Sequence, residues 1–240
     1  KPRDSFEGHI GIRTLEQGIV GFDPQTALRK TDGSTGPLPV TFAGQLPTGF
    51  DLKEVAGFRG PRFKSMGRVS LMAVFGALQA ISELGMTWDE FLQRVSPQMI
   101  GTYVSSGVGA FDRIEELVLG SHVNGRVTPS VLAEALPDTA GGHVGMILGL
   151  EGVNSSPVGA CATGGLSLYD AFHAIRTGRQ LAAFAGGYDA GLTLSSFRGF
   201  HAATALVEDA DLVKLGLRPD QASRPFDRTR SGFVVGEGGG

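Results

Sequence analysis

The stretch from Pro157 to Ala185 constrains the fold of this chain more than any other part of the sequence. A short apolar segment at 157–160 leads directly into Cys161, and apolar residues then recur at helical spacing over 168–175. Residues 181–185 form a continuous apolar run, which is typical of a strand covered on both faces. Strand, turn, helix and strand in this order predict a layered α/β fold.

The composition fits a packed globule and excludes several classes of protein. The 240 residues are 41% hydrophobic and 19% charged, as in one domain or a large piece of one. Glycine occurs 37 times, well above its usual share of about 7%, so we expect helices to pack closely on the sheet.

A net charge of −3 without a basic run argues against nucleic acid as a partner, and no apolar run is long enough to span a membrane. The single cysteine excludes an internal disulfide and a multi-cysteine metal site, so no metal is expected, and it indicates a reducing compartment, by default the cytoplasm.

Other local patterns predict further elements upstream of Cys161. The expected elements are a loop-rich region at 1–60 with a short strand at 40–43, a helix from Pro61 to about Gly85, a buried strand at 100–104, a helix capped by Thr128 and broken at Pro137, and a further apolar segment at 143–150.

Cys161 is the candidate nucleophile because it lies where a strand is expected to turn into a helix. The free N–H groups and the positive end of a helix dipole favour thiolate, and such positions lower a cysteine pKa from about 8.5 into the range of about 3.5–7.5. The same N–H groups suit the oxyanion of an acyl-transfer intermediate. Gly159, Gly164 and Gly165 would leave space for a substrate carbonyl. The alternative is that Cys161 is a small buried apolar residue.

Four motifs in sequence order resemble one known family. These are residues 157–164 around Cys161, the Ala-Gly-Gly-Tyr-Asp of 185–189, the segment 199–206, and the signature from Ser223 to Gly238. The β-ketoacyl–acyl carrier protein synthases carry similar motifs in this order, and four together are far more specific than one. Weaker matches lie upstream at 105–109 and 142–143.

The resemblance implies that residues 1–240 are the N-terminal portion of a ketosynthase domain whose C-terminal half is absent from this chain. The expected fold is the thiolase-type layered α-β-α-β-α fold, incomplete, in a homodimer or with a ketosynthase-like partner. The implied reaction transfers an acyl group from a carrier protein to Cys161. A decarboxylative Claisen condensation with a malonyl-carrier thioester then gives a longer 3-oxoacyl thioester, in fatty acid or polyketide synthesis. No cofactor is expected to be bound, because the substrates arrive on the phosphopantetheine arm of the acyl carrier protein.

The resemblance also implies roles for residues other than Cys161. Val108 and Phe200 match positions that line the acyl pocket, with ordinary core packing as the alternative for these two. Val131 matches a position that reaches into the pocket of a partner subunit. Arg62, Lys64 and Arg68 match a basic patch that receives the acidic carrier protein, and a solvated helix face is the alternative for each. The signature residues Arg224, Asp227, Arg230 and Glu237 are expected to be structural ion pairs and turn formers.

The family completes its site with two histidines from the C-terminal half. The histidines of this chain are His9, His122, His143, His173 and His201, and none lies in a segment resembling those catalytic motifs. The spacing of His173 on the helix after Cys161 indicates packing or surface. We therefore expect this chain to be inactive by itself, and to require a C-terminal half that supplies the two histidines.

Three other functions compete with this one. A non-catalytic ketosynthase-like scaffold or carrier-binding subunit is the main alternative, supported by the missing histidines and opposed by the presence of Cys161. A thiolase-like acyl-CoA enzyme of the same fold is opposed by the signature from Arg224 to Gly238. A serine hydrolase is excluded because the sequence has no Gly-x-Ser-x-Gly elbow.

Overall fold

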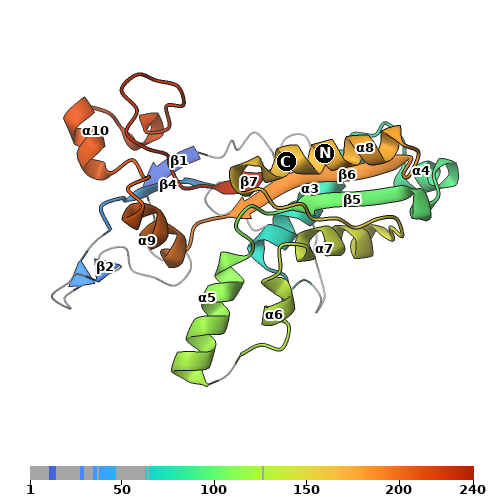
Figure 1. The fold of residues 1–240 in the computed structure, drawn as a ribbon, viewed down its shortest axis with the longest axis horizontal. Coiled ribbons are helices and arrows are strands. Elements are labelled where there is room, and N and C mark those ends of the chain that lie inside the picture. The colour runs from blue at the N-terminus through green and yellow to red at the C-terminus, as the bar shows by residue number, and fades with distance from the viewer. Residues whose placement is uncertain are drawn as a thin grey trace. The chain divides into compact units, whose positions relative to one another are not determined.

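The computed structural model describes residues 11–14, 28–29, 35–36, 38–46, 63, 65–125 and 127–240. The chain divides into two compact units. The smaller unit joins residues 1–50 to 191–238, and the larger unit joins 51–190 to 239–240. Figure 1 labels the elements of both.

A pair of parallel strands forms the centre of the larger unit. Strand β5 (Ile100–Ser105) pairs in parallel with β6 (Ala182–Ala190), in a register that places Ile100 opposite Ala182. Strand β7 (Glu237–Gly239) follows β6 in the sheet. On its other edge, β5 pairs with the chain at Asn154 through an isolated bridge from Thr102. All of β5 is buried, as expected for a strand bonded on both edges and covered on both faces.

Helices cover both faces of this sheet. Helix α8 (Thr163–Arg176) lies on one face, and α7 (Thr139–Leu148) lies on the other, packed against α3 (Arg68–Ser82) (Figure 1). Two glycines allow α8 and α3 to pack closely on β6. A Cβ on Gly187 of β6 would lie 2.8 Å from the Cα of Gly164 in α8, and one on Gly76 of α3 would lie 2.3 Å from the hydroxyl of Tyr188. The predicted layered α/β arrangement and the predicted role of glycine in it are confirmed.

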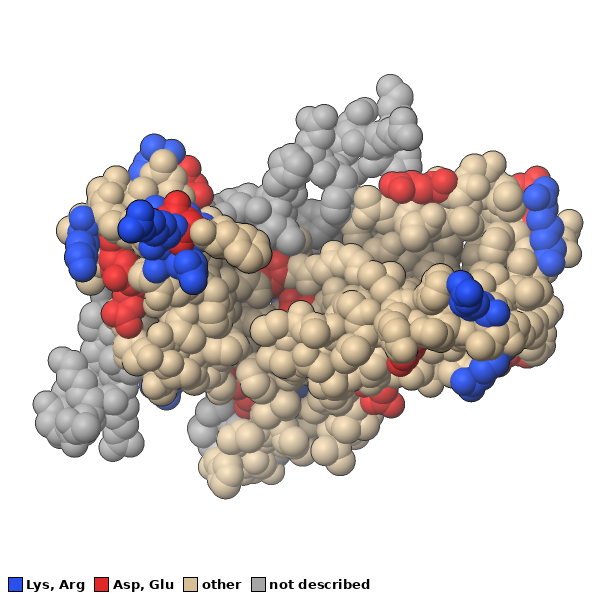
Figure 2. Space-filling model, turned by 45° about the horizontal axis from the view of Figure 1, so that its top comes forward, with Lys and Arg blue, Asp and Glu red and all other residues tan. Residues whose placement is uncertain are grey.

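Helix α8 turns its small residues toward the sheet and its large ones outward. Ser167, Ala171 and Ala174 are buried, whereas the larger members of the apolar pattern are exposed. Those are Leu168 (60% exposed), Phe172 (55%) and Ile175 (43%). The pattern therefore predicted the helix correctly, but its large side chains lie on a surface. In Figure 2, charged side chains are sparse on the face that α8 presents.

Shorter helices complete the larger unit: α4 (Trp88–Arg94), a 3₁₀ turn (Pro97–Met99), α5 (Phe111–Leu119), a π-helical turn (Gly120–Asn124) and α6 (Val131–Glu134). A capping box between Thr87 and Glu90 begins α4. The expected cap at Thr128 is wrong. Ser130 precedes α6 without a side-chain cap, and the hydroxyl of Thr128 donates instead to Glu116 of α5 at 3.0 Å.

The smaller unit has its own core around Phe42 and Phe197, both fully buried. Strand β4 (Phe42–Gln45) pairs antiparallel with β1 (Gly11–Thr14). Its other elements are β2 (Leu28–Arg29), β3 (Thr35–Gly36), α9 (Leu194–Ala202), α10 (Asp209–Leu215) and a 3₁₀ turn (Pro219–Gln221). Among the described residues, no helix has the length and apolar character needed to cross a membrane.

Candidate active site

Cys161 lies in a sharp turn at the start of α8. The chain leaves the edge of β5 after Ser155, whose N–H donates to Thr102 at 2.9 Å, and then enters a 3₁₀ turn at Ala160–Ala162. The expected strand at 157–160 is not formed, because the paired residues lie earlier, around Asn154. The thiol is free and exposed, so within this chain Cys161 is not the small buried apolar residue of the alternative interpretation.

The residue before the thiol has an unusual backbone conformation. Ala160 has φ of 49°, in the left-handed region that residues other than glycine adopt uncommonly. Thr163, itself 3% exposed, holds this turn with its hydroxyl. The oxygen accepts the N–H of Gly159 at 3.0 Å and the hydroxyl donates to the carbonyl of Ala160 at 2.7 Å. The conformation is thus imposed by hydrogen bonds around Cys161, as is common where strain is kept at functional positions.

The glycines beside Cys161 serve packing more than substrate access. A Cβ on Gly159 would lie 2.4 Å from Leu166, and Gly164 lies against Gly187 of β6. Of the three expected glycines, only Gly165 has open space around it, because a Cβ there would meet no other atom within 4 Å. Open space near the thiol-bearing turn is therefore found at Gly165, and its use by a substrate carbonyl stays a prediction.

The turn that follows β5 lies directly against the thiol-bearing turn. A Cβ on Gly107 would be 2.5 Å from the carbonyl oxygen of Ala160. Val108 is the next residue, partly buried, and its N–H donates to Asp189 at 3.3 Å. The structure thus brings the segment of Val108 next to the turn that carries Cys161. Sequence reasoning missed Thr163 and Asp189 as the groups that hold these two turns, although both lie within the motifs that carry the family resemblance.

Phe200 and Val131 occupy packed positions. Phe200 belongs to the smaller unit, where it packs on the core and meets Phe233 edge to face at 4.9 Å between ring centroids. Val131 at the start of α6 is 2% exposed, whereas Leu132 beside it is 66% exposed. Their pocket-lining roles stay predictions, and Leu132 is the large exposed side chain of α6.

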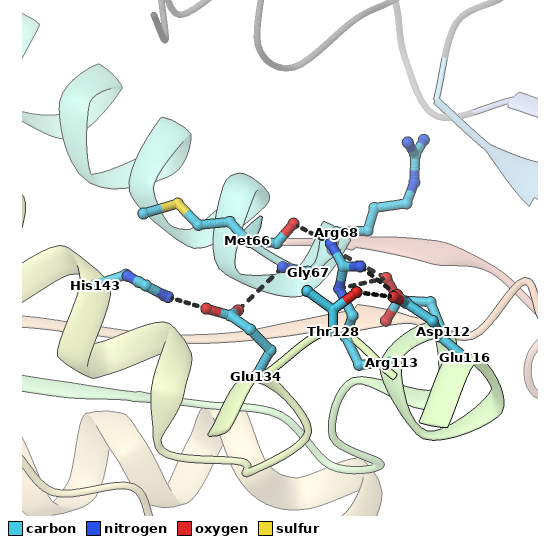
Figure 3. Close-up of polar contacts among 9 residues, drawn as sticks. All are labelled: Met66, Gly67, Arg68, Asp112, Arg113, Glu116, Thr128, Glu134 and His143. Atoms are coloured by element: carbon cyan, nitrogen blue, oxygen red, sulfur yellow. Dashed lines mark hydrogen bonds and ion pairs between the residues drawn. The ribbon is translucent and has the colours of Figure 1, made fainter. Parts of the chain in front are cut away.

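Of the three expected carrier-docking residues, only Arg68 is described; Arg62 and Lys64 lie outside the described residues. Arg68 begins α3, and its N–H donates to Asp112 of α5 at 3.2 Å. Its side chain extends away from the polar network at this helix start (Figure 3).

The polar network at the start of α3 joins α3, α5, α6 and α7 through buried polar groups (Figure 3). Glu134 of α6, 5% exposed, accepts the N–H of Gly67 at 3.0 Å and contacts the ring of His143 of α7 at 2.7 Å. Arg113 of α5 donates to the carbonyl of Met66 at 2.6 Å. Burial by itself raises the pKa of Glu134, but the hydrogen bonds from His143 and Gly67 outweigh it and leave that pKa below its ordinary value. Sequence reasoning missed Glu134.

The described histidines are engaged in structural contacts or lie on the surface. His143 pairs with Glu134, and His201 pairs with Glu208 at 3.0 Å. His173 is exposed and contacts the ring of Tyr169 at 4.3 Å between centroids, which confirms the interpretation of packing or surface. His9 lies outside the described residues.

The signature near the C-terminal end of the sequence is structural, as expected. Asp227 accepts the N–H and the hydroxyl of Thr229 at 2.7 and 2.8 Å and pairs with Arg224 at 3.7 Å. These hydrogen bonds from Thr229 lower the pKa of Asp227. Arg230 donates to the carbonyl of Asp227 at 2.9 Å, and Glu237 accepts the N–H of Leu46 at 3.1 Å.

An apolar cavity of about 410 Å³ lies in the larger unit, lined by residues of α3, α4 and the first residues of β5 and β6. It is at the opposite ends of these strands from the turns at Gly107 and Cys161.

Comparison with known proteins identifies relatives over most of the chain. Residues 8–240 match the model of the β-ketoacyl synthase N-terminal domain. The 3-oxoacyl-(acyl-carrier-protein) synthase 2 of Staphylococcus aureus is 31% identical over 226 residues, covering 93% of this chain and 51% of the relative. The protein of the same name from Synechocystis sp. is 33% identical over 179 residues, covering 74% of this chain and 41% of the relative.

Solved structures of ketosynthases also resemble this chain. A β-ketoacyl synthase from Burkholderia phymatum superposes with a TM-score of 0.72 at 26% identity, covering 97% of this chain and 51% of that one. The ketosynthase FabY from P. aeruginosa gives a TM-score of 0.75 at 27% identity, covering 84% of this chain and 32% of that one. The chain spans about half the length of the curated relatives it matches. The expected thiolase-type fold, present as its N-terminal part, is confirmed, and the chain belongs to the β-ketoacyl synthase family.

Proposed function

We propose that the protein to which this chain belongs is a condensing enzyme, a β-ketoacyl–acyl carrier protein synthase with Cys161 as nucleophile. The observation that carries the proposal is the exposed thiol of Cys161 in the constrained turn at the start of α8. Family membership supports it, and so do relatives named 3-oxoacyl-(acyl-carrier-protein) synthase 2. A non-catalytic scaffold would have no need for an exposed thiol at this turn.

In the loading step, the thiolate of Cys161 attacks the carbonyl carbon of an acyl thioester on the phosphopantetheine arm of the carrier. The C–S bond to the arm breaks, the arm leaves as a thiol after taking a proton, and the acyl group remains on Cys161 as a new thioester. Backbone N–H groups at the start of α8 are suited to stabilise the oxyanion that forms in between. No bound cofactor is required for this exchange of one thioester for another.

In the condensing step, a malonyl-carrier thioester loses carbon dioxide and becomes a carbanion. This carbanion attacks the carbonyl of the acyl-Cys161 thioester, a C–C bond forms, the bond to sulfur breaks, and a 3-oxoacyl-carrier thioester leaves. We propose that two histidines of a C-terminal half assist decarboxylation and stabilise the carbanion. The residues of this chain alone would then load an acyl group without condensing it.

The exposed face of α8 supports the proposal that such a half covers it. Leu168, Tyr169 and Phe172 are each more than half exposed on one helix, and exposed apolar patches of this kind mark interaction sites. Since the chain spans about half of the curated relatives' length, the other half is the proposed occupant. We also propose a dimer with a second copy or a ketosynthase-like partner, in which α6, through Val131 or the exposed Leu132, approaches the pocket of the partner.

Intact-mass spectrometry after incubation with an acyl-carrier thioester tests the nucleophile. We expect one acyl adduct on the wild-type protein and none on Cys161→Ala. Val213→Ala, which changes an exposed side chain of α10 in the smaller unit, serves as the matched control and should load normally. Full loading of Cys161→Ala would refute the proposal, whereas carrier binding without any adduct on the wild type would favour the scaffold.

We propose that Arg62, Lys64 and Arg68 receive the acidic carrier protein. Reversing the charges of Arg62 and Lys64 should weaken carrier binding at low salt and have less effect at high salt, because exposed charges are screened there. Calorimetric titration of the carrier at both salt concentrations measures this. Unchanged affinity at low salt would remove the docking assignment and leave the nucleophile untouched.

A further inference from the structure

Asp189 stands near the carboxyl end of β6, with one carboxylate oxygen at the meeting point of three hydrogen bonds. The hydroxyl of Ser106 donates to it at 2.5 Å, the N–H of Gly107 at 3.1 Å and the N–H of Val108 at 3.3 Å. All three donors lie in the turn that follows β5, about eighty positions earlier in the sequence. Successive backbone N–H groups around one anionic oxygen form a strong and directional anchor.

This anchor determines the shape of the whole turn. Ser106 is 1% exposed, and while it donates to Asp189 its oxygen accepts the N–H of Gly109 at 2.8 Å. Gly109 has φ of 73°, a conformation that favours glycine. Three residues of the turn therefore donate hydrogen bonds to Asp189, and the N–H of Gly109 at the end of the turn donates to the hydroxyl of Ser106. Without the carboxylate, the buried Ser106 hydroxyl and the two N–H groups lose their common acceptor.

The turn that follows β5 packs against the peptide unit that precedes Cys161. Gly107 approaches the carbonyl of Ala160 so closely that a Cβ there would be 2.5 Å from the oxygen. Ala160 itself is held in a left-handed conformation, and Cys161 is the next residue. The contacts thus run from Asp189 through Gly107 to Ala160 and the thiol.

We propose that Asp189 is a positioning residue for Cys161: its carboxylate holds the turn 105–109 against Ala160 and so keeps the thiol in the orientation needed for acyl loading. The same bonds place Val108, which the family resemblance assigns to the acyl pocket. The proposal rests on the proposed function, because it concerns the same nucleophile. Asp189 acts through the turn and takes no part in bond making.

The test uses the full-length protein with Asp189→Ala, Asp189→Asn and a matched control, Asp209→Ala. Asp209 also accepts an N–H and a hydroxyl, both from Thr41 at 3.2 and 3.0 Å, but it belongs to the smaller unit. Single-turnover loading is measured by mass spectrometry of the Cys161 peptide over a range of acyl-carrier concentrations. Alkylation of Cys161 by iodoacetamide at one fixed pH is followed in parallel, and thermal melting reports the stability of each variant.

We expect Asp189→Ala to lower the maximal loading rate by about 10²-fold, as a misplacement of roughly 1 Å does, without changing the half-saturating carrier concentration. Its rate of alkylation by iodoacetamide at the same pH should also depart from the wild-type rate, because the thiol is displaced. Asp189→Asn should recover much of the rate, because the amide oxygen accepts the same bonds, and Asp209→Ala should load at the wild-type rate even if it melts earlier. Wild-type loading by Asp189→Ala, or an equal loss in Asp209→Ala, would overturn the proposal. If the wild type accepts no acyl group, the proposed function fails, and the alkylation rates still decide whether Asp189 positions the thiol: equal rates for Asp189→Ala and the wild type would overturn that role.

Discussion

The buried carboxylate of Glu134 should be one of the largest single contributors to the stability of the larger unit. Glu134→Ala removes the acceptor of the Gly67 N–H and the partner of the His143 ring, which lie 3.0 and 2.7 Å from its oxygens. Since Glu134 is 5% exposed, water does not readily replace these contacts. Leaving a buried hydrogen-bonding group without its partner typically costs about 1–3 kcal/mol, so for the two lost contacts we expect a total loss of about 3 kcal/mol. Glu134→Gln keeps the shape and one acceptor and should cost roughly 1 kcal/mol.

The effect of Glu134 should depend on pH in one direction. Burial opposes ionisation, but the hydrogen bonds from His143 and Gly67 prevail and lower the pKa of Glu134 below its ordinary value of 4.5. A carboxyl whose pKa is lower in the folded state stabilises the fold fully above its unfolded pKa and loses this contribution as the pH falls through the folded value. The difference between wild type and Glu134→Gln should therefore be largest near neutral pH and shrink below about pH 4.5.

Hydrogen exchange at the start of α3 and along α6, with thermal melting at about pH 7 and about pH 4, measures both effects. Glu83→Gln, a change of an exposed carboxyl at the end of α3, is the control and should match the wild type at both pH values. A wild-type melting temperature for Glu134→Ala at neutral pH would refute the reasoning. A difference between wild type and Glu134→Gln that grows toward acid pH would contradict the sign of the linkage.

Four further substitutions test the packing within the two units. Gly187→Ala should destabilise the larger unit by about 1–3 kcal/mol, because its Cβ would meet the backbone of Gly164 at 2.8 Å; Gly165→Ala, with open space, should instead be neutral or stabilising in thermal melting. Gly107→Ala should slow acyl loading of Cys161 by about 10²-fold through displacement of the adjoining turn, and an unchanged single-turnover rate would contradict the tight contact. Phe197→Ala should cost the smaller unit about 3–5 kcal/mol, since its ring is fully buried; chemical denaturation measures this loss, and a loss below about 1 kcal/mol would argue against that core.

Much of the fold followed from local patterns. The strands β5 and β6 and the helix after Cys161 were predicted, because an uninterrupted apolar run and a helical spacing are properties of neighbouring residues; β5 is fully buried, whereas the apolar run in β6 is only partly buried. The orientation of α8 did not follow. Helical spacing shows that Leu168, Phe172 and Ile175 share a face, but not whether the sheet or another segment covers it. In the structure the sheet takes the small residues, since Gly164 and Gly187 allow the helix to approach closely.

Part of the candidate site could likewise be predicted from the sequence, and part could not. The sequence by itself determined the family, through four ordered motifs, and with it the identity of Cys161 as the candidate nucleophile. Only the tertiary structure showed that Asp189 bonds to the turn at Gly107, 82 positions away, and that this turn lies against Ala160. The physical reason is that a motif records which residue types are present, whereas the partner of a carboxylate or a backbone N–H is chosen by the packing of strands and turns distant in sequence.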